Sequence, residues 1–161
     1  MRNRLKPNLG IDFMLKRDSH NNQDDIKKAE VCALVCDINA QMFKNGILKN
    51  KSKGALYYTP DSFTVDHEDG DRMSSFHLNV LNGVYSIMPD YHVSKTGKKK
   101  AMSSEELTHV TGETDSLDTV LNTLEYILAH YYPSAVEDGR LKQAIENIRN
   151  PGSMSTPAVD L

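Results

Sequence analysis

Two turn dipeptides, Asp69-Gly70 and Asn82-Gly83, constrain the fold more than any other feature of the sequence. Each separates two stretches in which apolar and polar residues alternate. A two-residue turn of the I′ type needs positive φ angles, which asparagine, aspartate and glycine tolerate best. The dipeptides therefore predict three consecutive antiparallel strands. The second turn also predicts a register in which Leu81 faces Val84.

A further strand precedes these three. Thr59-Pro60-Asp61-Ser62 fits a type I turn with proline at its second position, and apolar residues flank it on both sides. Pro89 limits the last strand or marks a sheet edge, because proline cannot donate a ladder hydrogen bond. The resulting meander has four predicted strands, over residues 55–58, 63–68, 73–81 and 84–88.

Apolar spacing predicts one long helix before the meander and two helices after it. The first begins at Asp24 and ends at Asn45-Gly46, and its two apolar stripes predict that it is covered on two sides. The second begins near Asp115 and ends before Pro133. The third opens with a capping box of Ser134 and Glu137.

The N-terminal part of the chain predicts one more strand. Apolar residues at positions 9, 11, 13 and 15 alternate with other residues over seven positions, which is the period of a strand. The polar residues 16–23 then predict a loop. This segment is a candidate fifth strand of the sheet.

These predictions give an α+β fold: a four-stranded antiparallel meander, with the fifth N-terminal strand as an option, packed against one long N-terminal helix and two C-terminal helices. We expect a flexible arm over residues 1–8, a single domain over 9–150 and a disordered tail over 151–161. A chain of 161 residues buries enough surface to fold without a disulfide or a metal.

Composition excludes several classes of function. The net charge of −3 argues against a general nucleic-acid binder, which is usually strongly basic. No apolar run approaches the roughly 18 residues of a membrane helix. Cys32 and Cys36 are predicted to be buried free thiols of a protein that folds in the cytoplasm, with delivery by a dedicated secretion system left open. The acidic run Asp66–Asp71 lacks the spacing of a calcium loop, so neither a metal nor a cofactor is expected.

Histidines are the candidate catalytic residues. His92-Val-Ser94 and His109-Val-Thr111 resemble the paired His-x-Ser/Thr motifs of a class of phosphoesterases. In the predicted register His77 pairs with Met88 and His92 with Met73, which separates the two histidines by roughly 13 Å. If the protein is an enzyme, His77, His92 and His109 would act as general acids and bases.

The candidate binding residues are tyrosines and lysines. Tyr85 and Tyr91 lie on the predicted fourth strand or just after it, and tyrosine is favoured at interfaces. A basic cluster follows in the loop predicted over residues 94–115, where a helical turn is expected near 104–109. Its lysines are Lys95, Lys98, Lys99 and Lys100.

The sequence favours a non-enzymatic protein-interaction protein, such as an adaptor, an inhibitor or a chaperone-like accessory factor. Its partner would be another protein, bound through the sheet face or the 94–115 loop, and a homodimer is left open. The alternative is a small histidine-dependent phosphoesterase or other hydrolase. A weaker alternative is nucleic-acid contact through the lysine loop, although a nucleic-acid partner is not expected from the net charge.

Overall fold

The computed structural model describes residues 9–49, 54–59, 62–94, 96–102 and 110–151, and the side chains within these ranges from residue 23 onward. The predicted arm 1–8 and the tail from residue 152 therefore lie outside the described residues. The elements follow in the order α1 (Leu9–Lys44), β1 (Leu56–Thr59), β2 (Ser62–Asp66), β3 (Arg72–Leu81), β4 (Val84–Ser94), β5 (Lys99–Ala101), β6 (Gly112–Thr114), α2 (Leu117–Tyr131), α3 (Pro133–Glu137) and α4 (Arg140–Arg149).

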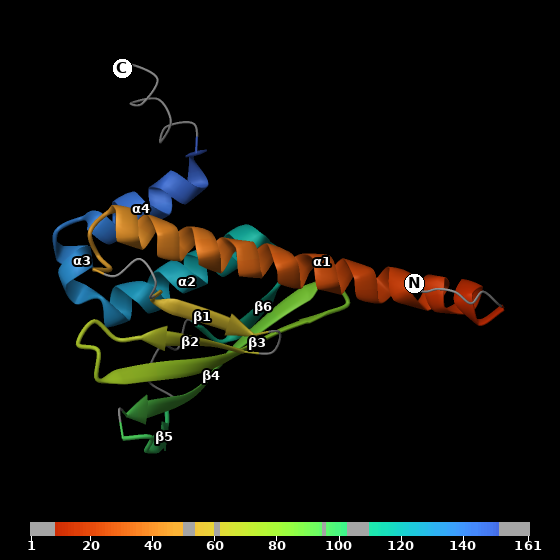
Figure 1. Ribbon diagram of the computed structural model, residues 1–161, viewed down its shortest axis with the longest axis horizontal. Helices are drawn as coiled ribbons and strands as arrows, with labels where there is room; N and C mark the ends of the chain where they lie inside the picture. The colour runs from red at the N-terminus through yellow and green to blue at the C-terminus, as the bar shows by residue number, and fades with distance from the viewer. Residues whose placement is uncertain (1–8, 50–53, 60–61, 95, 103–109, 152–161) are drawn as a thin grey trace.

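The protein is an α+β fold of two layers, as predicted. β1 to β4 form an antiparallel meander, and β5 and β6 both pair with the outer side of β4. Helices α1, α2 and α4 lie on one side of this sheet, and α1 extends well beyond it (Figure 1). Apolar side chains of both layers form the core between them, including Phe63, Phe76, Leu78, Ile38, Met42, Leu124 and Leu128. Within the described residues, no helix is long and apolar enough to cross a membrane.

The N-terminal strand is the main error of the sequence prediction. Residues 9–15 and the predicted loop 16–23 belong to α1, which is one continuous helix from Leu9 to Lys44. The alternating apolar positions are also four residues apart in pairs, 9 with 13 and 11 with 15, and a helix shares that spacing. A seven-residue pattern of period two therefore did not distinguish the two structures.

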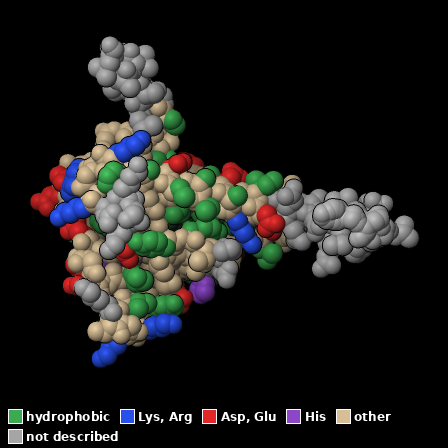
Figure 2. All heavy atoms as spheres, viewed as in Figure 1, with side chains coloured by type: hydrophobic (Ala, Val, Ile, Leu, Met, Phe, Trp, Pro, Cys, Tyr) green, Lys and Arg blue, Asp and Glu red, His purple; other side chains and the backbone are tan. Residues whose placement is uncertain are grey.

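From residue 23 onward, helix α1 is covered on one side only, contrary to prediction. Its first apolar stripe is buried against the sheet and α4, whereas Ile26 and Phe43 of the second stripe are exposed. Cys32 and Cys36 are also exposed, so the prediction of buried thiols is wrong. Figure 2 shows hydrophobic side chains gathered along the visible face of this helix.

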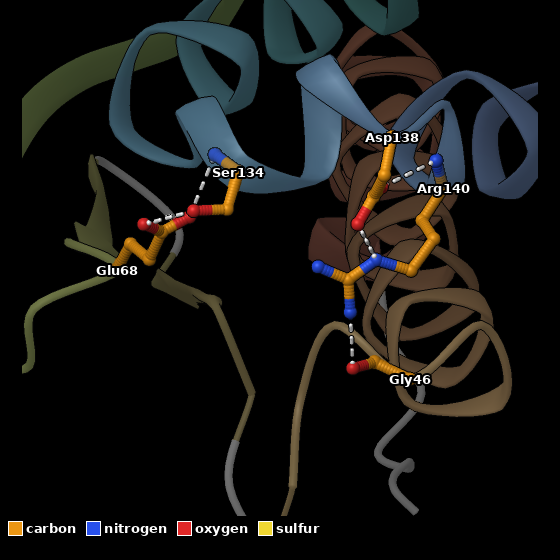
Figure 3. A network of polar contacts seen from close by, with 5 residues as sticks. All are labelled: Gly46, Glu68, Ser134, Asp138 and Arg140. Carbon is orange, nitrogen blue, oxygen red and sulfur yellow. Dashed lines mark hydrogen bonds and ion pairs between the residues drawn. The ribbon is translucent and has the colours of Figure 1, made fainter.

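The last predicted helix is divided in two. Gly139, with a φ of 81°, separates α3 from α4. Ser134 forms no capping box with Glu137, because its backbone N–H and its hydroxyl both donate to Glu68 (Figure 3). Arg140 then ties α4 to the end of α1 by donating to the carbonyl of Gly46 at 2.6 Å (Figure 3).

The two predicted turns differ in their outcome. Asn82 and Gly83 have φ angles of 53° and 80°, which confirms a I′ turn. Asp69-Gly70 is instead the middle of a four-residue loop, since the N–H of His67 donates to the carbonyl of Arg72 and only Gly70 has a positive φ. The loop is longer than predicted because the N–H of Glu68 donates to the carbonyl of Tyr131 in α2 and not to a neighbouring strand.

Strand β4 contains a bulge that shifts its register by one residue. Leu81 pairs with Val84 and His77 with Met88, as predicted. Beyond that point Phe76 pairs with Pro89 and Ser75 with Tyr91, so Asp90 is the extra residue. His92 consequently pairs with Ser74, and its predicted pairing with Met73 is wrong.

The segment predicted as a long loop is partly sheet. β5 pairs with residues 91–93 of β4, and β6 pairs with residues 85–87. The bulge and Pro89 lie between these two paired stretches. The helical turn predicted near residues 104–109 lies outside the described residues.

The long helix and the I′ turn are joined by one carboxylate. Asp24 of α1 is almost fully buried and accepts hydrogen bonds from the backbone N–H groups of Asn82 and Gly83, at 2.9 and 2.8 Å. We expect Asp24→Ala to lower the free energy of unfolding by about 2 to 4 kcal/mol, because hydrogen bonds to charged groups contribute roughly 1.5 to 3 kcal/mol each. Chemical denaturation measures the loss.

Asp25 provides the matched control, because it is the next residue of the same helix and is exposed. Asp25→Ala should change stability by less than about 0.5 kcal/mol. Equal losses in the two variants would show that the charge at the helix surface, and not the link to the turn, carries the effect.

Candidate functional site

A cleft of about 690 Å³ opens at one end of the helix-covered face of the sheet, where α2 ends. The β2–β3 loop, the ends of β3 and β4, β5 and the α2–α3 junction all contribute to its lining. Aromatic and imidazole rings form one part of it: His67, His92, His130 and Tyr131. Cationic side chains form another part, those of Arg72, Lys98 and Lys100, and Lys99 also borders the cleft.

The β4 bulge places His92 in this cleft. Side chains alternate between the two faces of a sheet, so a one-residue shift moves a side chain to the other face. Paired with Met73, His92 would share the face of His77, away from the helices. Paired with Ser74, it lies on the face of Phe76 and Leu78, which the helices cover.

A buried hydroxyl bridges two of the histidines. Ser74 is 0% exposed, and its Oγ lies 2.7 Å from Nε2 of His67 and 2.7 Å from Nδ1 of His92. His67 reaches this position from the loop after β2, because the hydrogen bond between its N–H and Arg72 closes that loop. Three side chains that are distant from one another in the sequence thus form one polar chain.

The ring of Tyr131 packs against the ring of His67 and holds it in place. The two rings stack with centroids 4.0 Å apart and planes 13° apart, and the edge of His92 faces Tyr131 at 6.5 Å. His130 contacts the same tyrosine at 4.9 Å between centroids. Both α2 residues occupy its last turn, so the end of this helix positions the aromatic part of the cleft.

Burial makes His67 a poor base. It lowers the pKa of His67 from 6.5 to about 4, and the nearby positive charge of Arg72 adds to the effect. The imidazole is therefore neutral at physiological pH. A neutral ring with a hydrogen bond to Ser74 can donate or accept, but it supplies no charge to the cleft.

The acidic residues beside the cleft each have a local partner. Both carboxylate oxygens of Glu68 accept hydrogen bonds from Ser134 (Figure 3). Asp69 accepts the N–H of Asp71, and this bond and Arg72 lower the pKa of its carboxyl group. Among the described residues that line the cleft, Arg72, Lys98 and Lys100 therefore outnumber the two acidic residues, Glu68 and Asp69.

The predicted catalytic histidines are not brought together. His77 lies on the opposite face of the sheet, with its Nε2 3.4 Å from the carboxylate of Asp90, whereas His92 lines the cleft. His109 lies outside the described residues. Sequence reasoning missed His67, Ser74 and His130 as members of a site. The register implied by a turn at Asp69-Gly70 already places His67 opposite Arg72 and Val65 opposite Ser74, as observed, so this register was the signal that could have brought His67 and Ser74 together.

The predicted binding residues also separate. Tyr85, a candidate binding residue, is 1% exposed and belongs to the core, so its ring offers almost no surface to a partner. Tyr91 lies on the sheet face away from the cleft, with Lys99 Nζ 4.6 Å from its ring centroid. Lys98, Lys99 and Lys100 line the cleft, and Lys95 lies outside the described residues.

Two further observations bear on the assignment. In the described part of the chain, no cluster of three or more histidine, cysteine or acidic side chains is arranged to hold a metal ion. No protein-family model, curated protein or solved structure matches the chain. A proposal about function therefore depends on the geometry of the cleft.

The low pKa of His67 makes stability depend on pH. Between pH 6.5 and 4 the unfolded chain binds a proton at this residue that the folded chain does not, so stability falls as the pH drops through this window. We expect the contribution to be about 3 kcal/mol, since one pKa unit corresponds to 1.36 kcal/mol. Denaturation curves across this pH range should show it in the wild type and not in His67→Gln.

The exposed His77 is the matched control for this measurement. His77→Gln should keep the pH dependence of the wild type, because that ring lies outside the cleft and on the other face of the sheet. An unchanged slope in His67→Gln would contradict a buried, neutral His67.

Proposed function

We propose that this protein is a non-enzymatic binding protein that recognises a phosphate group on a protein partner through the cleft. The observation that carries the proposal is the convergence of Arg72, Lys98 and Lys100 at one opening, in a chain whose net charge is −3. Lys99 borders the same opening, but its Nζ lies over the ring of Tyr91 on the other face of the sheet. A general surplus of positive charge does not explain such a cluster.

The kinds of side chain in the cleft favour phosphate over a single carboxylate. The guanidinium group of Arg72 offers a planar fork of N–H donors, which suits the oxygens of a phosphate. The lysines add point charges around the phosphate, and imidazole N–H groups deeper in the cleft can donate hydrogen bonds to its oxygens. Clusters of this kind recognise phosphorylated motifs in other proteins.

The neighbouring strand favours an extended peptide as the carrier of that phosphate. β5 ends the strand order β1 to β5, and its residues are exposed. An exposed edge strand can pair with an added peptide strand through main-chain hydrogen bonds. A peptide along β5 would bring its side chains to the mouth formed by Lys98 and Lys100.

A second candidate function is hydrolysis of a phosphoester by histidines. The contacts of Ser74 with His67 and His92, beside His130, favour it, because such a chain can orient a general acid or base. Ser74 itself is fully buried and is not a nucleophile for an external substrate. In this function His92 and His130 would exchange protons with the substrate.

Two expectations from the sequence stay predictions. A cytoplasmic location is supported by Cys32 and Cys36, which are free thiols. A homodimer is not needed to complete the cleft, which one chain forms by itself.

Phosphate binding is the direct test of the proposed function. Titration with inorganic phosphate and with a phosphoserine peptide, followed by calorimetry, should give saturable binding to the wild type. Arg72→Gln and Lys100→Gln should each weaken it by about 3- to 10-fold, because a charge pair at 4 Å in water is worth about 1 kcal/mol and 1.4 kcal/mol is tenfold. Lys142→Gln is the matched control, since Lys142 is exposed on α4 and does not line the cleft.

Equal affinities in all three variants and the wild type would contradict the proposed site. Tighter binding of the phosphopeptide than of free phosphate would support the peptide as the carrier. Equal affinities for the phosphopeptide and for free phosphate would indicate that the cleft recognises only the phosphate group.

Turnover of p-nitrophenyl phosphate and bis-p-nitrophenyl phosphate distinguishes phosphoester hydrolysis from phosphate binding. The binding proposal predicts no release of nitrophenol above the rate in buffer. The hydrolase predicts release that falls by about 100-fold or more in His92→Gln, which is the usual contribution of general acid–base catalysis. His77→Gln should leave any such rate unchanged.

A further inference from the structure

The hydroxyl of Ser74 has one hydrogen atom and two imidazole neighbours, and this mismatch limits what the histidines can do. Ser74 can donate to only one of the two ring nitrogens that lie 2.7 Å from its Oγ. The other nitrogen must carry a hydrogen and donate to Oγ. The protonation states of His67 and His92 are therefore linked through this one buried oxygen.

Two neutral arrangements satisfy both hydrogen bonds. In the first, Nε2–H of His67 donates to Oγ and Oγ–H donates to Nδ1 of His92, whose own proton is on Nε2. In the second, Nδ1–H of His92 donates to Oγ and Oγ–H donates to Nε2 of His67, whose own proton is on Nδ1. Exchanging the arrangements moves one proton from Nε2 of His67 to Oγ and one from Oγ to Nδ1 of His92. It also requires His67 to gain a proton at Nδ1 and His92 to lose one at Nε2, so both outer nitrogens must exchange protons with their surroundings.

One extra proton, added to the two that the neutral rings already carry, can be held by only one of the two rings at a time. When His92 carries both protons, its Nδ1–H must donate, and His67 is held neutral with its proton on Nδ1. When His67 carries both, the roles reverse. If both rings were charged, both would donate to Oγ, and the buried O–H would lose its acceptor while two positive rings stood 6.0 Å apart. This cost opposes a second charge until the pH falls to the His67 pKa of about 4.

The surroundings favour the charge on His92. His67 is 8% exposed and lies near Arg72, whereas His92 is half-buried at the cleft. The other charged or titratable groups that line this region are Asp69 and Glu68 of the β2–β3 loop, His130 of α2, and Lys98, Lys99 and Lys100 of the β5 segment. The two carboxylates are engaged by Arg72 and Ser134.

We infer that Ser74 is a positioning residue that joins His67 and His92 into a pair holding a single extra proton, which His92 carries at the cleft. Protonation of His92 then forces His67 into its Nδ1–H tautomer. An anion in the cleft favours the charged His92, so its binding takes up a proton. This last step rests on the anion site proposed above, whereas the tautomer exchange depends only on the Ser74 contacts.

Nitrogen NMR of the histidine rings tests the tautomer exchange in the unliganded protein. Nitrogen chemical shifts distinguish an N–H from a bare ring nitrogen. In the wild type we expect Nε2 of His67 to carry no hydrogen whenever His92 is charged. Any N–H character that Nε2 of His67 has at higher pH should be lost at the same midpoint at which His92 becomes charged. The shared midpoint should disappear in Ser74→Ala and persist in Ser74→Thr, which keeps the hydroxyl.

Three results would overturn the pair. They are a His67 that keeps Nε2–H when His92 is charged, a state with both rings charged at a pH well above the His67 pKa of about 4, and an unchanged shared midpoint in Ser74→Ala. The wild-type spectra decide the question by themselves if Ser74→Ala does not fold.

Sulfate is the probe for proton uptake, because it does not titrate near neutral pH and any proton taken up belongs to the protein. Calorimetry at several pH values from 6 to 8, in two buffers of different ionisation enthalpy, should show net proton uptake of at most one proton when sulfate binds. His92→Gln should reduce this uptake, and His77→Gln should not. Sulfate binding without proton uptake would overturn the coupling between anion binding and protonation of His92. If sulfate does not bind, both this coupling and the proposed function are overturned. The NMR spectra of the unliganded protein test the tautomer exchange independently of both results.

Discussion

The single extra residue in β4 is the constraint on which the candidate site depends. Without Asp90 as a bulge, the register set by the Asn82-Gly83 turn would continue to the end of the hairpin. His92 would then point away from the helices, and Ser74 would have only His67 beside it. Bulges are known to redirect side chains near functional sites, and here one residue converts a surface histidine into a cleft histidine.

The second requirement is the attachment of the β2–β3 loop to the helical layer. Glu68 forms this attachment through two groups: its backbone N–H donates to the carbonyl of Tyr131, and its carboxylate accepts hydrogen bonds from Ser134. These bonds hold His67 under the ring of Tyr131, at a stacking distance of 4.0 Å. The sheet therefore supplies Ser74 and His92, the loop supplies His67, and α2 covers all three.

Local patterns predicted the elements that local physics determines. The I′ turn at Asn82-Gly83, the four-strand meander and the α2 stripe follow from backbone preferences and from residue spacing within one segment. The N-terminal strand failed because a short apolar pattern satisfied two periods at once. The bulge at Asp90 leaves no such pattern, since it depends on how β4 meets β3 on one side and β5 and β6 on the other. The site was missed for that reason, although its lysines 98, 99 and 100 were identified.

The buried groups and the charged groups lie at different depths in the cleft. The deepest groups, His67 and Ser74, are nearly inaccessible, and a low pKa keeps His67 neutral, so they contribute hydrogen bonds and no net charge. The charge comes from Arg72 and the lysines at the mouth, where water reduces the cost of keeping it. An anion that enters would meet screened positive charge first and directional donors second. This order favours a ligand with several oxygens, which can use both layers, over one that carries charge alone.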